Sequence, residues 1–338
     1  MVSLLTIKII DTIADVSLLQ KILDDLGDTV MPSLFLAPSL KKYWLLSFFQ
    51  AYGISRNLAI TVVFEDDFPR LVLPLQRKDE TCLEFLCDET SDYNDFLYSE
   101  INVKFLSYAL KYWISQGIRK IHLNQLPQNS KTIELFRIIT LEMKWKLEIE
   151  KCDSLPIVIS QPNKVVRDWN GADKHAIKRY EQKQKTLEKI ADISFTFIET
   201  PSQLVDIFPM IRHIHINRWK LKGIESKYMD SRRESFIMDI CKEAIMDNSL
   251  FFPILKIDNN LASFIIGFRC GNTVYDWNTA FSVDYFRWSP GGLLLLHVLS
   301  NSKKLDFAKY NLMKGIEKYK FIWTNTIEDT ISLIVTLP

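Results

Sequence analysis

Apolar residues recur along this chain with the periods of both helices and strands. The clearest helical pattern lies between residues 103 and 115, where the apolar side chains share one helix face, namely Phe105, Leu106, Ala109, Leu110 and Trp113. Two apolar runs, 58–64 and 71–75, flank the polar turn 65–70 and predict a β-hairpin. The pattern predicts an α+β fold with mixed, mostly antiparallel sheets flanked by helices.

The predicted elements occur twice in the same order. In each half, a three-stranded meander is followed by a helix, a strand, a second helix and a last strand. In the first half these segments are 58–64, 71–75, 82–86, 103–115, 118–123, 132–143 and 145–149. In the second half, after a helix at 204–219, they are 251–257, 261–268, 273–281, 290–300, 307–312, 316–321 and 331–337. We expect domains at 1–160 and 193–338 joined by a basic helical linker at 161–192; two ordinary α+β modules without a repeat are the alternative.

The composition narrows the function classes. The chain has 338 residues, of which 47% are hydrophobic, which is enough to form a core in each of two domains. Its 42 basic and 41 acidic residues give a net charge of +1, so nothing indicates a nucleic-acid partner. Five cysteines without a C-x-x-C pair argue against a disulfide framework and a metal site, and they are typical of reduced cytoplasmic thiols. We expect neither a signal peptide nor a membrane span.

A paired-glycine turn precedes the apolar helix at 290–300. Glycines let the backbone approach a ligand closely, and the first amides of a helix bind phosphate groups, so a pyrophosphate is expected here. The predicted contacts are Arg287, Ser289, Pro290, Gly291, Gly292 and Leu293. A simple chain turn is the alternative. The corresponding segment of the first half, 98–101, has no glycine and contains Glu100, so we expect only the second half to bind this ligand.

Basic residues recur at helical spacing between the two halves. Lys174, Lys178, Lys185 and Lys189 share this spacing, and Arg179 lies beside them. One interpretation is a solvated linker helix. The other is that Lys174, Lys178 and Arg179 bind an anionic substrate.

An ordered set of motifs resembles a known group of proteins. The motifs are Phe35-Leu36-x-Pro38, Leu73-Pro74-Leu75, Asp92-Tyr93-x-Asp95, His215-x-x-Arg218-Trp219-x-x-x-Gly223, Ser289-Pro290-Gly291 and Gly315-x-Glu317-x-Tyr319-Lys320. Together they resemble the CelD/BcsL-type acetyltransferase-like proteins, a double-GNAT group similar in architecture to the FemABX transferases. The resemblance implies two tandem GNAT-like domains, the N-terminal one degenerate and the C-terminal one binding acyl-CoA. The sequence departs from the group at Asn311, where Asp is common, and Arg287-x-x-Pro290-x-Gly292 only approximates the usual GNAT phosphate signature.

Acyl transfer from a thioester to an amine needs a base, a polarised carbonyl and a proton for the leaving thiolate. His215 lies on the inward face of its helix and is a candidate base, although a hydrogen-bonded core histidine is the alternative. Asp276 and Asn278 share one face of an alternating strand and are expected to hold the amine, Asp276 as a catalytic residue. A surface position of Asp276 is the alternative. The resemblance implies that Tyr319 protonates the thiolate. The alternative is that Tyr319 packs in the core.

The remaining candidates would bind the acceptor. Arg218 and Trp219 follow His215 in its motif, and Glu317 and Lys320 flank Tyr319, although Lys320 could simply pair with Glu317. In the first half, Asp92 and Tyr93 are candidates to reach a sugar hydroxyl or amine, and a turn with helix-capping aspartates explains the same residues.

The sequence thus predicts a cytoplasmic acyl-CoA-dependent N-acyltransferase. By resemblance, its acceptor is an amino sugar, in nucleotide-linked form, and its pathway is surface-polysaccharide biosynthesis. The alternatives are FemABX-like aminoacyl transfer to a peptidoglycan precursor and a non-catalytic binding protein derived from GNAT domains. The first alternative would need a basic surface for tRNA, which the net charge does not support.

Overall fold

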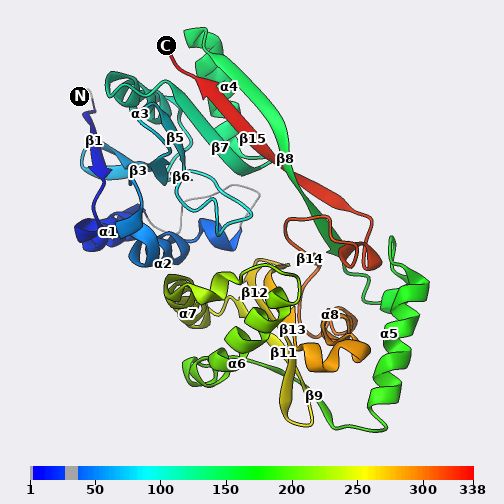
Figure 1. The fold of residues 1–338 in the computed structure, drawn as a ribbon. Coiled ribbons are helices and arrows are strands. Elements are labelled where there is room, and N and C mark those ends of the chain that lie inside the picture. Colours follow the sequence, from blue (N-terminus) through cyan, green and yellow to red (C-terminus); the bar gives the residue numbers. More distant parts are fainter. Residues whose placement is uncertain (1–2, 27–36) are drawn as a thin grey trace. The chain divides into compact units, whose positions relative to one another are not determined.

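The computed structural model describes residues 3–26 and 37–338, which form two compact units (Figure 1). Unit 1 comprises residues 1–153 and 329–338, and unit 2 comprises residues 154–328. Both are α+β, as the periodicity predicts. The motif Phe35-Leu36-x-Pro38 begins in 27–36, outside the described residues.

Unit 1 contains two sheets and the helices α1 (Val16–Leu26), α2 (Lys42–Tyr52), α3 (Val103–Ser115) and α4 (Lys131–Met143). One sheet has the order β1-β2-β3-β6, with β1 at Leu5–Ile10, β2 at Ile60–Glu65, β3 at Phe68–Leu73 and β6 at Leu97–Tyr98. The other has the order β4-β5-β7-β15-β8, with β4 at Leu75–Arg77, β5 at Cys82–Phe85, β7 at Lys120–Pro127, β8 at Lys146–Ile159 and β15 at Ile327–Thr336. The antiparallel pairing of β2 and β3 confirms the predicted hairpin.

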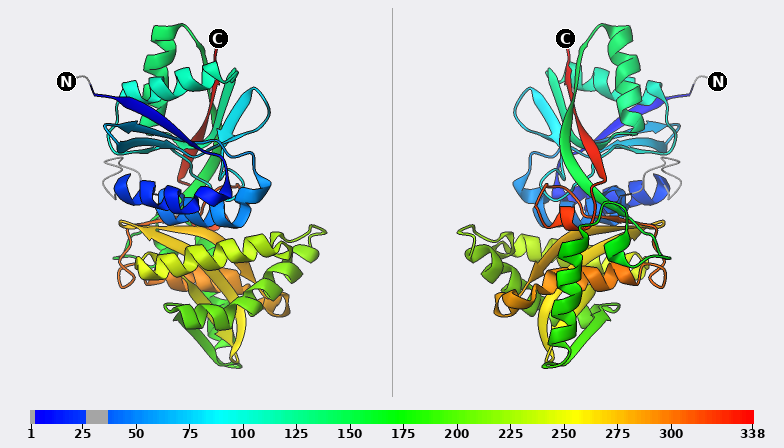
Figure 2. Two further views of the ribbon diagram at one scale, coloured as in Figure 1. Left: turned by 90° about the vertical axis from the view of Figure 1, so that its left-hand side faces the viewer. Right: turned by 90° about the vertical axis from the view of Figure 1, so that its right-hand side faces the viewer.

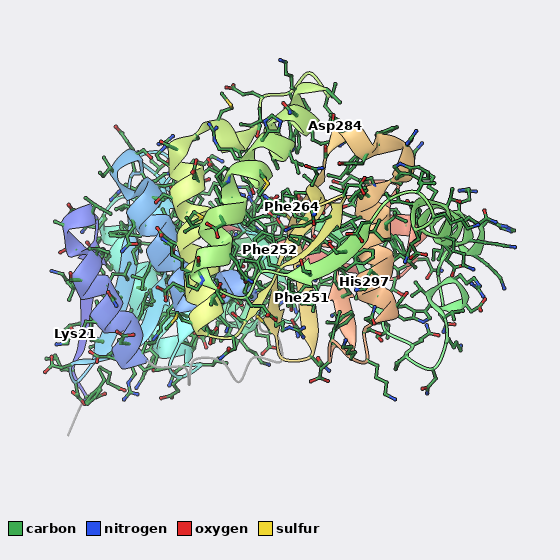
Figure 3. All side chains as sticks on the ribbon, turned by 90° about the horizontal axis from the view of Figure 1, so that it is seen from below. Lys21, Phe251, Phe252, Phe264, Asp284 and His297 are labelled. Carbon is green, nitrogen blue, oxygen red and sulfur yellow. The ribbon has the colours of Figure 1, made fainter. Side chains whose placement is uncertain are left out.

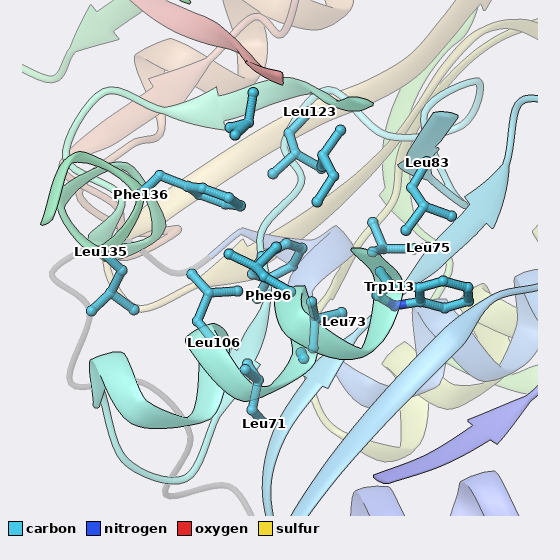
Figure 4. Packing of buried hydrophobic residues seen from close by; sticks show 14 of the residues in the cluster. Leu71, Leu73, Leu75, Leu83, Phe96, Leu106, Trp113, Leu123, Leu135 and Phe136 are labelled. Atoms are coloured by element: carbon cyan, nitrogen blue, oxygen red, sulfur yellow. The ribbon is translucent and has the colours of Figure 1, made fainter. Parts of the chain in front are cut away.

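The core of unit 1 forms where the apolar faces of α3 and α4 pack on the strands (Figure 4). Phe96, Leu106 and Phe136 are fully buried there. The indole of Trp113 is also buried, and its Nε1 donates a hydrogen bond to Oγ1 of Thr61 at 2.9 Å. The helical pattern at 103–115 therefore identified a real core face.

Unit 2 is built on a sheet with the order β9-β11-β12-β13-β14-β8. Its strands are β9 (Ile193–Phe197), β11 (Pro253–Ile257), β12 (Asn260–Cys270), β13 (Thr273–Phe281) and β14 (Lys309–Asn311), and β10 (Leu250–Phe251) pairs with β12. Its helices are α5 (Lys174–Leu187), α6 (Pro201–Lys220), α7 (Ser231–Met246) and α8 (Pro290–Ser300). Helices α6 and α7 cover one face of the sheet, and α5 and α8 cover the other (Figure 2).

The sheet of unit 2 has a core on each face. Phe251 packs on the side of α8 with Val298 and Leu299. His297 of α8 stacks on Phe195, with ring centroids 3.9 Å apart. Phe252 and Phe264 form a separate aromatic contact at 6.4 Å (Figure 3). Both faces are thus sealed by aromatic and aliphatic side chains.

Three predictions about elements are corrected. The last strand, placed in the second half at 331–337, pairs with β7 of unit 1, with Leu333 opposite Leu123. Alternation predicted the strand but carries no information about its partner. The short helix at 316–321 is instead a loop that ends in a 3-10 turn at Lys320–Ile322. The basic segment is not a free linker, because α5 packs on α8 within unit 2.

Candidate active site in the second unit

Strands β13 and β14 separate at the centre of the unit 2 sheet. They pair in parallel only from Thr273 opposite Lys309 to Tyr275 opposite Asn311. Strand β13 continues to Phe281 and pairs over this length with β12 alone among the described strands. Beyond Tyr275, none of the described strands pairs with β13 on its β14 side, and an extended ligand can hydrogen-bond to this edge.

A β-bulge interrupts β13 at the point of separation. Asp276 pairs with Gly267 and Asn278 with Ile266, which leaves Trp277 as the extra residue. Gly267 permits this close approach, because a Cβ there would lie 2.7 Å from the carbonyl oxygen of Tyr275. Cross-strand partners share a face, so the bulge places Asp276 and Asn278 on opposite faces of the sheet. The expectation that these two residues share one face is therefore wrong, because strict alternation fails at a bulge.

Asp276 is the most perturbed carboxylate of the site. It is 6% exposed, its Oδ2 accepts a hydrogen bond from the Tyr310 hydroxyl at 3.1 Å, and its Oδ1 is buried without a partner. Burial raises the pKa of Asp276 to about 7, against the opposing effects of Tyr310 and Lys320. A carboxyl that titrates near neutrality and keeps one oxygen free has the properties of a general base.

The loop after β14 brings Tyr319 into the electrostatic field of Asp276. Oδ1 of Asn311 accepts a hydrogen bond from the Met313 amide at 2.8 Å, which starts the turn. Nζ of Lys320 donates to the carbonyl oxygens of Met313 and Lys314, at 3.1 and 2.6 Å. Lys320 also pairs with Glu317 at 3.0 Å, as the alternative interpretation held. These contacts fix the loop and give Lys320 and Glu317 a structural role.

Tyr319 remains protonated over the working pH range. Although 40% of the residue is exposed, desolvation raises the pKa of Tyr319 well above its ordinary value. The charges of Asp276 and Glu317 raise it further. The hydroxyl therefore carries a proton at neutral pH, and its donation to the leaving thiolate, the role that the resemblance implies, stays a prediction.

The predicted phosphate turn lies at the N-terminus of α8. Ser289 has a left-handed backbone, with φ of 56°, and its side chain makes no capping hydrogen bond to the helix. Instead, Oγ of Ser289 accepts a hydrogen bond from Nζ of Lys183 on α5, at 2.7 Å. Because Gly291 and Gly292 lie in the first turn, their amides have no acceptor within the helix. A lysine cation next to these donors makes a suitable place for a phosphate group.

The other members of the phosphate set differ in exposure. Arg287 is exposed and stacks on Trp288, with its guanidinium carbon 4.8 Å from the ring centroid. Pro290 occupies the first position of α8, where its missing amide hydrogen costs nothing. Leu293 is fully buried and belongs to the core under α8.

The two glycines of the turn have different structural roles. A Cβ at Gly292 would lie 2.5 Å from Cε1 of Tyr180, whereas one at Gly291 would lie 3.4 Å from Cδ1 of Phe281, an ordinary contact. Tyr180 is itself stacked on Trp323, with centroids 5.4 Å apart. Gly292 therefore allows α5 to pack on α8, a role that the sequence interpretation missed.

We expect Gly292→Ala to lower the free energy of unfolding by about 1–3 kcal/mol, because the added methyl group would clash with the ring of Tyr180, which is held by stacking on Trp323. Gly291→Ala is the matched control and should raise it by up to about 1 kcal/mol, since alanine favours a helix. Urea denaturation of both variants measures the difference. If the cost comes from Tyr180, it should vanish in a Tyr180→Ala background; a cost that persists there would contradict this explanation.

His215 is held by hydrogen bonds at both ring nitrogens. Trp219 donates from Nε1 to Nε2 of His215 at 2.9 Å, and Nδ1 lies 2.8 Å from Oγ of Ser226. Burial lowers the pKa of His215 to about 4, and the cations Arg233 and Lys222 lower it further. The imidazole is neutral, with its free lone pair already accepting from Trp219. This geometry favours the interpretation of His215 as a hydrogen-bonded core histidine.

The other predicted substrate residues are dispersed. The guanidinium of Arg218 lies over the ring of Phe281 at 4.5 Å, at the end of β13. Lys174 pairs with Asp168 at 2.9 Å, and Lys178 and Arg179 are exposed on α5. Since α5 packs on α8, these cations lie on the face of the sheet that carries the phosphate turn.

In unit 1, Tyr93 is 2% exposed, and Asp92 precedes it. Asp95 accepts hydrogen bonds from Ser130, at 2.6 Å, and from Thr132, at the start of α4. Burial raises the pKa of Asp95 to about 6. Ser130, and not Asp95, is the N-cap of α4, so Asp95 has a structural role next to the cap.

Comparisons with known proteins identify the fold of this site. Residues 174–321 match the family model described as acetyltransferase (GNAT) domain. The matched segment lies within unit 2 and covers less than half of the chain. None of the curated proteins compared with the sequence matches it. This family model describes GNAT acetyltransferase domains in general. The narrower resemblance to the CelD/BcsL-type proteins stays a prediction.

Solved structures share the fold of the whole chain. A conserved protein of unknown function from Bacteroides thetaiotaomicron has a TM-score of 0.62 at 15% identity, covering 98% of this chain and 100% of that one. FemX has a TM-score of 0.61 at 8% identity, with coverages of 95% and 96%. L-PGS from Bacillus licheniformis has a TM-score of 0.54 at 9% identity, with coverages of 87% and 90%. These likenesses, at identities of 8–15%, show a shared α+β fold; that both units are GNAT-like stays a prediction.

None of the helices within 3–26 and 37–338 is both long and apolar enough to cross a membrane. Over the same ranges, no group of three or more His, Cys, Asp or Glu side chains is arranged to bind a metal ion.

Proposed function

We propose that this chain is a cytoplasmic acyl-CoA-dependent N-acyltransferase that acylates an amino sugar, in nucleotide-linked form, during surface-polysaccharide biosynthesis. The observation that carries the proposal is the separation of β13 from β14 at Asp276, within a segment that matches an acetyltransferase model. The buried, unpartnered Oδ1 of Asp276 at this point is available to an acceptor amine. The acceptor class rests on the sequence resemblance.

The residues of unit 2 fit an acyl-CoA. The edge of β13 beyond Tyr275, where β14 no longer pairs with it, offers backbone groups to the amides of a pantetheine arm, and the first turn of α8 with Lys183 offers donors to its pyrophosphate. Because α5 packs on α8, the exposed cations Lys178 and Arg179 are candidates to bind the remaining phosphate rather than the acceptor. We therefore revise their role from acceptor binding to acyl-CoA binding.

The acyl-CoA supplies an activated carbonyl, and the protein supplies two proton transfers. Asp276 accepts a proton from the acceptor amine as the nitrogen bonds to the carbonyl carbon. Tyr319 donates its proton to the sulfur as the carbon–sulfur bond breaks. Each residue is returned to its starting state by exchange with solvent.

Unit 1 is proposed to be the degenerate half. Its α3 corresponds to α8 in the order of elements, but it is capped by the side chain of Asn102, which accepts from the Lys104 amide at 3.1 Å. Glu100 lies two residues before this cap. A capped first turn next to a carboxylate does not favour a pyrophosphate.

Lys183→Glu should weaken acetyl-CoA binding at least about tenfold, because it replaces the cation at the phosphate turn by an anion. Lys185→Glu, which changes an exposed charge on the same helix, is the matched control and should change the dissociation constant little. Isothermal titration calorimetry measures both. An unchanged affinity in a folded Lys183→Glu variant would place the pyrophosphate elsewhere.

Turnover tests the reaction itself. Release of CoA from acetyl-CoA is measured with free and nucleotide-linked amino sugars, and a faster reaction of the linked sugars would support the nucleotide-linked acceptor, which rests on the sequence resemblance. Acetyl-CoA binding without any amine-dependent release would favour the non-catalytic alternative. Aminoacyl transfer from charged tRNA, tested in parallel, would favour the FemABX-like alternative.

A further inference from the structure

One arginine of α7 is buried without a counter-ion. Arg233 is 8% exposed, and its guanidinium carbon lies 4.7 Å from the ring centroid of Trp277, the bulged residue of β13. Its Nε is buried and has no hydrogen-bond partner. Among the described residues, no carboxylate forms an ion pair with Arg233, although two nearby arginines have carboxylate partners. Arg232 pairs with Asp230 at 2.8 Å, and Arg212 with Glu234 at 3.5 Å.

An unpaired cation in this position is costly to the fold. Burying the guanidinium removes its favourable free energy of hydration. Without an anionic partner, no ion pair compensates for this loss. The aromatic ring of Trp277 offsets only part of the loss. Since the nearby acidic side chains are engaged by surface arginines, the anion that would compensate Arg233 is absent from its surroundings in the chain.

Two further polar groups near Arg233 lack partners. The hydroxyl of Tyr228 is buried and unbonded. Tyr228 stacks on His215 with centroids 4.2 Å apart, and Arg233 acts electrostatically on both residues. Oδ1 of Asn278 is likewise buried and unbonded, and Asn278 follows Trp277 on the face of the sheet that α6 and α7 cover. Buried polar groups are normally paired, so three such groups on one face point to a ligand.

We propose that these residues form the acceptor subsite and that the acceptor is an amino sugar carrying a carboxylate, which Arg233 binds. The proposal rests on the proposed function and deepens it by naming the substrate class. Tyr228 donates to the same carboxylate, and Oδ1 of Asn278 accepts from an N–H or O–H of the sugar. The subsite lies on the face of β13 opposite to the phosphate turn and to Asp276, so the acceptor's amine must reach Asp276 at the point beyond Tyr275 where β13 and β14 are no longer paired.

A carboxylate suits this site better than a phosphate. Arg233 supplies one positive charge in a planar fork, which matches a carboxylate in charge and shape. The other cation whose charge acts on His215 here, Lys222, is stacked over the ring of Trp219 at 4.6 Å. A phosphate dianion would leave one charge uncompensated in a buried site.

Three sugars that differ only at carbon 6 test the proposal. They are 2-amino-2-deoxyglucuronic acid with a carboxylate, glucosamine with a hydroxyl, and glucosamine 6-phosphate. Binding is measured by calorimetry on the full chain without acyl-CoA, so that failure of this proposal is distinguishable from failure of acyl transfer. We expect the uronic acid to bind at least about tenfold more tightly than the other two. Tighter binding of the phosphate, or equal binding of all three, would overturn the proposal.

Arg233→Met keeps the apolar stem and removes the charge. The variant should lose the preference for the uronic acid, bind acetyl-CoA as the wild type does, and unfold at an equal or higher temperature. Arg232→Met removes a paired surface charge and should keep the preference. A retained preference in Arg233→Met overturns the proposal. If Arg233→Met fails to fold while Arg233→Lys folds and binds the uronic acid no better than glucosamine, Arg233 is structural and the proposal is likewise overturned.

Discussion

Replacing Asp276 by asparagine should lower turnover by about 10²–10⁴-fold, because the amide cannot accept the proton of the acceptor amine. Asparagine preserves the shape of the side chain and can still accept the hydrogen bond from Tyr310. Acetyl-CoA affinity should therefore change little. Steady-state kinetics with acetyl-CoA and an amino sugar measure the loss. Asp206→Asn, which alters an exposed carboxylate of α6, is the control and should leave turnover unchanged.

The pH dependence follows from the raised pKa of the same group. A base must be ionised, so wild-type turnover should fall as the pH drops through about 7, the pKa to which burial raises Asp276. In the Asp276→Asn variant, turnover should not show this fall at low pH. The folded state also holds the proton more tightly than the unfolded chain, so this group's contribution to stability is present below the unfolded pKa and is lost as the pH rises through about 7. Above that pH, the asparagine variant should be the more stable protein.

If turnover of the Asp276→Asn variant still fell as the pH dropped through about 7, the assignment of Asp276 as the base would be contradicted. So would a variant that folds and retains full turnover. In either case the proton would pass to another group or to water, and the raised pKa of Asp276 would reflect burial alone.

Local patterns in the sequence predicted local structure well. The helix at 290–300 has the bounds of α8, because Pro290 fixes its start and the apolar run marks its buried length. The hairpin of β2 and β3 was similarly evident from its polar turn. Helix α7 went unnoticed, although Phe236, Ile237, Ile240 and Cys241 recur at helical spacing and are all buried. This helical spacing was the sequence signal for α7. It would also have identified Arg233 as a charged residue in a helix with a buried face.

The chemistry of the site depended on contacts between distant residues, which no local pattern reveals. The bulge at Trp277 depends on Gly267 of the neighbouring strand. Gly292 is needed because the ring of Tyr180 packs against it, and Ser289 accepts a hydrogen bond from Lys183. The two residues of each pair are more than one hundred positions apart in the sequence. His215 was correctly placed on an inward face, but only the three-dimensional arrangement showed Trp219 and Ser226 at its two nitrogens.

Replacing Tyr319 by phenylalanine should lower turnover by about 10²-fold, since the departing thiolate would lose its proton donor. Phenylalanine retains the ring, so acetyl-CoA binding and the free energy of unfolding should change little. Kinetics and calorimetry on the same preparation separate these quantities. Tyr285→Phe is the control, because the Tyr285 hydroxyl contacts the carbonyl oxygen of Ile257 at 3.5 Å and should not affect turnover.

The identity of the leaving thiol distinguishes a proton donor from a packing residue. An acyl thioester of an acidic aryl thiol releases a stable thiolate that needs no proton, so Tyr319→Phe should slow this substrate much less than it slows acetyl-CoA. A ring that only packs in the loop would affect both thioesters equally. Equal losses on the two substrates would therefore show that Tyr319 shapes the site, and that the proton reaches the sulfur from solvent.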